Sequence, residues 1–241
     1  MPPETLADVA AEVVACRRCP RLVAWREEAA ASPPARFSGQ RYWARPLPGF
    51  GDPAARILVV GLAPAAHGGN RTGRLFTGDR SGDFLFASLH RTGFASAATS
   101  TSAGDGLALD GVYISAIVRC APPDNKPTPD ERAACLPFLV RELGLLPGVR
   151  VVVALGSFAW DGAIRAIAGM GRRAMPKPEF GHLAEARIGA YSLLGSYHPS
   201  QQNTFTGRLT PPMLDAAMVR AGELAGLTPG GVGPSRDPAQ G

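Results

Sequence analysis

Four short stretches of this chain are rich in apolar residues, at residues 57–60, 112–118, 149–155 and 190–194, and the first is apolar throughout. Runs of this length that are apolar at successive positions are typical of strands buried on both faces of a parallel sheet. Between and around them, apolar residues recur at helical spacing. These segments predict helices over residues 4–15, 81–91, from 128 onward, 157–167 and 211–224. The alternation predicts a three-layer α/β/α sandwich with a mostly parallel four-stranded sheet.

The remaining segments read as connections. Residues 29–51 contain scattered prolines and aromatics, residues 95–106 are a low-complexity stretch expected to be mobile, and residues 169–185 are polar. The Pro/Gly-rich residues 227–241 are predicted to be a disordered tail. The length of 241 residues suits one domain, so we expect a single unit over residues 1–226.

Composition and charge limit the cellular compartment and the kind of partner that we expect. No apolar run approaches the ~20 residues of a membrane span, and no secretory segment opens the chain, so we expect a cytoplasmic monomer without membrane contact. The net charge is +5, and Lys126 and Lys177 are its only lysines. An arginine-dominated surface fits a nucleic-acid partner, although a GC-rich genome would produce the same bias.

Four cysteines are present, as a Cys16-x-x-Cys19 pair followed by Cys120 and Cys135. In a reducing compartment such a set favours metal or cluster ligation over disulfides. Four thiolates can hold either zinc or an iron–sulfur cluster, and spacing alone does not separate the two.

A glycine-rich loop over residues 61–79 follows the first predicted strand. The glycine spacing from Gly68 to Gly73 matches that of a P-loop. However, Arg74 and Leu75 stand where a P-loop requires Lys and Ser/Thr, so we reject that interpretation. Loops at the carboxyl ends of parallel strands meet at one sheet edge, which would bring together Asp79, Asn125 and His198. Singly, these residues equally suit a helix cap, a turn and a structural histidine, and their joint occurrence favours a functional site.

The motifs beginning Gly61-Leu-Ala-Pro, Thr77-Gly-Asp and His198-Pro-Ser-Gln-Gln-Asn resemble those of the uracil-DNA glycosylase superfamily, specifically family 5. The resemblance implies a monofunctional base-excision enzyme that hydrolyses the N-glycosidic bond of uracil, and of other deaminated bases such as hypoxanthine and xanthine, in DNA. It also implies a [4Fe–4S] cluster held by Cys16, Cys19, Cys120 and Cys135. The competing interpretation is a non-catalytic, cluster-bearing module that binds nucleic acid.

The resemblance implies a role for each site residue. Asp79 would stabilise the sugar cation and handle water, His198 would donate a hydrogen bond to the departing base, and Asn125 would read the base or hold the water. The expected base pocket comprises Gly61, Ala63, Pro64, Ala65, Phe76 and Asn203. Sister families carry a polar residue at the position of Ala63, and its absence here leaves the water to Asp79. Expected DNA contacts are Arg71, Arg74, Ser200, Gln201, Gln202 and Arg208.

Overall fold

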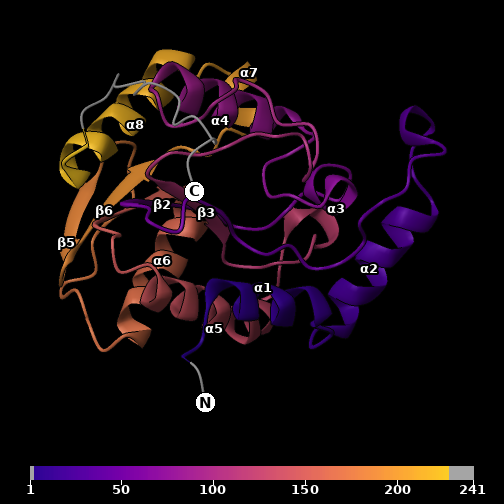
Figure 1. Ribbon diagram of the computed structural model, residues 1–241, viewed down its shortest axis with the longest axis horizontal. Helices are drawn as coiled ribbons and strands as arrows, with labels where there is room; N and C mark the ends of the chain where they lie inside the picture. The colour runs from indigo at the N-terminus through magenta and orange to yellow at the C-terminus, as the bar shows by residue number, and fades with distance from the viewer. Residues whose placement is uncertain (1–2, 228–241) are drawn as a thin grey trace, which may run out of the picture.

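The computed structural model describes residues 3–227, so the predicted tail lies outside the described residues except for Leu227. A six-stranded sheet crosses the molecule in the order β1-β3-β2-β4-β6-β5 (Figure 1). Its four central strands are parallel and confirm the four apolar runs. They are β2 (Ile57–Gly61), β3 (Val112–Ala116), β4 (Val151–Leu155) and β6 (Tyr191–Ser196).

The prediction of four strands was wrong in number, because each edge of the sheet carries one more. The antiparallel strand β1 (Phe50–Gly51) lies in the segment expected to be a loop. The other, β5 (Glu185–Ile188), begins at the end of the expected polar connection and is largely exposed. Both are short and solvated on one side, so neither produces the apolar run by which the central strands are found.

The five predicted helices are present with shifted ends: α1 (Leu6–Ala15), α4 (Arg80–Arg91), α5 (Pro129–Leu145), α6 (Ser157–Gly169) and α8 (Pro211–Ala225). Thr128 and Glu131 form the expected capping box at the start of α5, which continues through Pro137. The structure adds α2 (Pro20–Ala31), with proline at its first position, and four short pieces that the sequence did not indicate. These are η1 (Ala35–Phe37), α3 (Gly69–Thr72), η2 (Pro123–Asn125) and α7 (Gln201–Phe205).

Helices cover both faces of the sheet, which confirms the three-layer architecture. In Figure 1 the pair α5 and α6 lies below the sheet and the pair α4 and α8 above it. Alternate residues of β2 divide accordingly: Leu58 and Val60 join the core with α5 and α6, whereas Ile57 and Val59 join the core with α4 and α8. Helices α2 and α3 lie together at one side, beyond the carboxyl ends of the strands.

Two expectations about the connections need correction. Residues 95–106 are held by hydrogen bonds with Arg74 and Thr77, so this stretch is tied to the body despite its low complexity. Leu227, assigned to the tail, donates its N–H to Gly222 and packs on the core beside α8. Within residues 3–227, no helix combines the length and apolar character needed to cross a bilayer.

Candidate active site

The loop after β2 is shaped by two glycines that stand against functional side chains. A Cβ atom on Gly61 would lie 2.6 Å from Cζ of Phe76, so the aromatic ring occupies the space that any other residue would need. A Cβ atom on Gly68 would overlap Oδ2 of Asp79. Glycine at these positions therefore lets the backbone approach the two predicted site residues closely.

Asp79 has the helix-cap role that the sequence allowed, and its catalytic role stays a prediction. It is the N-cap of α4, where its Oδ1 accepts a hydrogen bond of 3.0 Å from the N–H of Gly82. Its other oxygen, Oδ2, lies against Gly68. Burial raises the pKa of this carboxyl above its ordinary value, although the N–H groups of Gly82 and Ser81 act in the opposite direction. The Oδ1 atom thus caps the helix, and the Oδ2 atom faces Gly68.

A cleft of about 800 Å³ opens beside Asp79. Asn125 lines it from the loop after β3, with φ of +57°, a backbone conformation that asparagine tolerates better than most residues. Ala65, Arg71 and Gln201 also line this cleft. The structure therefore brings Asp79 and Asn125 together at the sheet edge, as the topology predicted.

His198 does not line that cleft; it packs behind Phe76. The two ring centroids are 6.1 Å apart with an angle of 33° between the planes. Burial lowers the pKa of His198 to about 4, so the imidazole is neutral at neutral pH and has one N–H to donate. Asn203, expected in the base pocket, uses its side-chain amide to donate a 2.8 Å hydrogen bond to the backbone carbonyl of His198. It therefore braces the histidine loop.

The other predicted pocket residues differ in their surroundings. Ala63 is half-buried against the core between the sheet and α5–α6, and Pro64 is buried in the loop. Ala65 alone of the three lines the cleft. Phe76 has φ of +54°, and such strain in a bulky residue is typical of functional sites.

The prediction that Arg74 contacts DNA is wrong, because the side chain is not at the surface. Its side chain is 7% exposed and is paired with Asp105 inside the protein. Arg71 lines the cleft, but its Nε donates to the carbonyl of His67 and its Nη2 to that of Gly78, so it braces the loop on both sides. Arg208 is exposed with its guanidinium 4.6 Å from the Tyr197 ring centroid.

The short helix α7 carries the remaining predicted DNA contacts. Ser200 is its N-cap, and Gln201 and Gln202 are exposed, with Gln201 at the cleft. This placement leaves both amides available to a bound strand, so their role in DNA contact stays a prediction.

Sequence reasoning missed several residues of the cleft wall, because it assigned no helix to α2 and no order to residues 95–106. His67 belongs to the quoted motif but received no role; its Nδ1 lies 3.0 Å from the hydroxyl of Tyr42. The residues missed are Trp25, Arg36, Phe37, His67, Ser100 and Thr101. Pro20, at the first position of α2, is a local signal that could have indicated this helix, whereas its apolar periodicity is weak because Arg26 occupies the inner face.

The four cysteines converge from two distant parts of the chain on one small hollow of about 20 Å³. All four are free thiols, and burial raises the pKa of Cys120 to about 11 and that of Cys135 to about 12. No three of the Cys, His, Asp and Glu side chains within residues 3–227 are placed closely enough to hold a metal ion. All four cysteines nevertheless line the same hollow, so four thiol groups face one place in the fold.

Two buried arginines stand beside these thiols. Arg26 donates from Nη1 to Sγ of Cys120 at 3.0 Å, and the backbone N–H of Arg119 points to Sγ of Cys135 at 3.3 Å. The guanidinium of Arg26 would offset the charge of thiolates, whereas the guanidinium of Arg119 is paired with the buried Glu142. The backbone carbonyl of Arg26 also accepts a 3.1 Å hydrogen bond from Asn70 in α3, which connects the cysteines to the loop after β2.

The fold is a three-layer α/β/α sandwich with a cleft at the carboxyl ends of its parallel strands, and sequence comparison gives the family. The model of the uracil DNA glycosylase superfamily matches residues 48–220, so the chain belongs to that superfamily and is one of its enzymes. Its relatives confirm the resemblance to family 5.

The type-5 uracil-DNA glycosylase of Thermus thermophilus is 56% identical over 216 residues, which cover 89% of this chain and 96% of that protein. The type-5 enzyme of Mycobacterium leprae is 52% identical over 92% of this chain and 97% of its own length. That of Pyrobaculum aerophilum is 44% identical over 91% of this chain and 93% of its own.

Proposed function

We propose that the protein is a monofunctional DNA glycosylase that hydrolyses the N-glycosidic bond of uracil in DNA and leaves an abasic site. The observation that carries the proposal is the Asp79 carboxylate, held in the cleft shared with Asn125 while one of its oxygens remains off the helix cap. A paired base is out of reach in a duplex, so the nucleotide must be flipped into this region.

The chemical step then divides between two residues, Asp79 and His198. As the bond between C1′ and the base nitrogen breaks, the base leaves with the electron pair and positive charge develops on the sugar. Asp79 stabilises that charge and accepts a proton from the water whose oxygen bonds to C1′. Neutral His198 donates a hydrogen bond to the carbonyl oxygen of the departing base, where negative charge grows.

Phe76 and Asn125 complete the proposed arrangement. The Phe76 ring, packed on Gly61 and His198, offers a face on which the flipped base can stack. Asn125 at the cleft offers both a donor and an acceptor to the base edge or to the water. The matched motifs contain no lysine, so we propose no Schiff base and no strand cleavage.

We extend the proposal to hypoxanthine and xanthine in DNA, because Ala65, which lines the cleft, has no bulky side chain that would exclude larger bases. We also propose that Cys16, Cys19, Cys120 and Cys135 hold a [4Fe–4S] cluster. When bound, this group supplies a cross-link between the start of α2 and the end of β3. The donor set and the buried Arg26 and Arg119 support this assignment.

The test is incubation of the purified protein with oligonucleotides that carry uracil, hypoxanthine, xanthine or T opposite G, followed by alkali. We expect alkali-labile sites at uracil, and intact strands when alkali is omitted. Binding to these oligonucleotides without any abasic product would instead identify a non-catalytic module. Cleavage before alkali would overturn the monofunctional assignment.

A further inference from the structure

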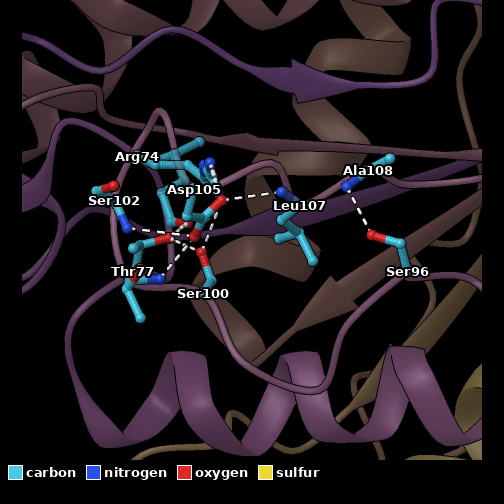
Figure 2. Close-up of polar contacts among 10 residues, drawn as sticks. Arg74, Thr77, Ser96, Ser100, Ser102, Asp105, Leu107 and Ala108 are labelled. Carbon is cyan, nitrogen blue, oxygen red and sulfur yellow. Dashed lines mark hydrogen bonds and ion pairs between the residues drawn. The ribbon is translucent and has the colours of Figure 1, made fainter.

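A closed set of polar contacts joins the segment 100–107 to the loop after β2 (Figure 2). Arg74 pairs with both oxygens of Asp105, at 2.7 Å to Oδ1 and 3.1 Å to Oδ2, and the two side chains are only 7% and 13% exposed. The same carboxylate accepts backbone N–H groups of its own segment, from Thr101 at 2.7 Å and Leu107 at 3.0 Å. Asp105 therefore bonds to both ends of its own segment and pairs that segment with Arg74.

The contacts continue toward Asp79 as a directed chain. Arg74 donates from Nη1 to Oγ of Ser100 at 2.8 Å, and the Ser100 and Thr77 hydroxyls are 2.7 Å apart. Because the Thr77 hydroxyl donates to the carbonyl of Leu75, Ser100 is the donor to Thr77. Thr77 is fully buried and lies two residues before Asp79.

The segment also forms part of the cleft. Ser100 and Thr101 line it together with Asp79, so the side of the segment that Asp105 organises is the side that a flipped nucleotide would meet. Since buried, bidentate arginine–carboxylate pairs fix geometry well, this arrangement holds the wall in one position.

We propose that Arg74 and Asp105 are positioning residues, which hold segment 100–107 as a fixed wall of the cleft and, through Ser100 and Thr77, fix Asp79 for catalysis. This inference rests on the proposed glycosylase function. Neither residue touches the reacting atoms. Each acts by preventing movement of this wall and of the backbone that carries Asp79.

The pH dependence of excision tests whether segment 100–107 is held as a fixed wall of the cleft. Asp79 must be ionised to act, so the rate falls as the pH falls through its pKa, which burial holds above the ordinary value. Releasing the wall would hydrate the carboxylate, lower that pKa and move the acidic limb to lower pH. The charged or titratable groups near Asp79 or on the same cleft, which the substitutions leave in place, are Asp83, Arg71, Arg80, Arg36, His67 and Asp124.

The experiment uses Asp105→Asn, which weakens the pairing with Arg74, and Ser100→Ala, which removes the hydrogen bonds of the Ser100 hydroxyl to Arg74 and Thr77 but leaves the Arg74–Asp105 pair in place. The control is Asp215→Asn, because Asp215 likewise accepts two bonds from an arginine, Arg91, and one from a serine, but joins α4 to α8 away from the cleft. Single-turnover excision of uracil is measured against pH for all proteins, with their melting temperatures.

We expect Asp105→Asn to slow excision about tenfold or more at neutral pH and to shift its acidic limb to lower pH, with a smaller change of the same kind for Ser100→Ala. Asp215→Asn should leave both unchanged. The inference is overturned by wild-type rates in both cleft variants, by a slower rate with an unmoved limb, or by an equal shift in the control. An inactive wild-type protein would overturn the proposed function instead.

Discussion

The ring of Phe76 packs on the imidazole of His198 with 6.1 Å between centroids, and its Cζ lies where a side chain at Gly61 would have to begin. Three predicted site residues from the ends of β2 and β6 are therefore interlocked. This contact explains why His198 is desolvated, and why it stands behind the cleft that Asp79 and Asn125 line.

The substitution Asp79→Asn tests the proposed catalytic role of Asp79 separately from its role as the N-cap of α4. Asparagine caps helices about as well as aspartate, so we expect a melting temperature close to that of the wild type. Excision should fall on the order of 10²–10⁴-fold in single-turnover assays, because the amide neither stabilises the sugar cation nor accepts a proton. Duplex binding should persist. An unchanged excision rate would contradict the role of Asp79 and make Asn125 the next candidate.

The excision rate of the wild type should depend on pH through Asp79. Burial raises the pKa of this carboxyl above its usual value of about 3.9, so the rate should fall on the acidic side with a midpoint above that value. Protonation of His198 contributes only near its pKa of about 4. The acidic limb should survive in His198→Ala and vanish from the residual rate of Asp79→Asn; a limb that disappears with His198 would reverse the two assignments.

The sequence predicted the central layers well, because residues such as Leu58 and Val153 belong to runs buried on both faces. It could not find α2 by periodicity. The inner face of that helix carries Arg26, whose guanidinium lies 3.0 Å from the Cys120 sulfur, so the apolar stripe is interrupted where the helix faces the cysteines.

The site was predictable only in part. Asp79 and Asn125 follow strands, and topology alone brings them together. The order of residues 100–107 depends on a contact between Arg74 and Asp105, which are 31 positions apart. A stretch of small polar residues carries no local sign of such a partner, and for the same reason Arg74 resembled a surface contact for phosphate.

Gly68→Ala tests the close approach of the loop to Asp79. The added methyl group would overlap Oδ2, so the carboxylate must shift, and excision should slow about tenfold or more. Gly144→Ala is the matched control, because a Cβ there meets nothing within 4 Å in helix α5 and should stabilise the fold by about 0.5–1 kcal/mol. Equal activity of both variants would show that Asp79 tolerates displacement.

The cysteine site predicts a coloured protein. We expect the purified protein to be brown, with broad absorbance near about 400 nm, and iron in stoichiometric amount. Cys120→Ala should lose this absorbance. It should also weaken substrate binding, because Cys120 contacts Arg26, whose carbonyl holds Asn70 in the loop after β2. If the purified protein were colourless and contained stoichiometric zinc, the four cysteines would form a zinc site and the assignment of an iron–sulfur cluster would be wrong.

His198→Ala should reveal whether the imidazole assists the departing base. Because the pKa of His198 is about 4, the ring is neutral over the working pH range and donates one hydrogen bond, whose contribution grows as negative charge accumulates on the base. Losing one such donor slows excision on the order of 10²–10³-fold. The loss should be smaller for 5-fluorouracil than for uracil, since the more acidic base leaves more readily as an anion and needs less help. Equal losses for both bases, with a large fall in melting temperature, would show that His198 supports only the packing of Phe76.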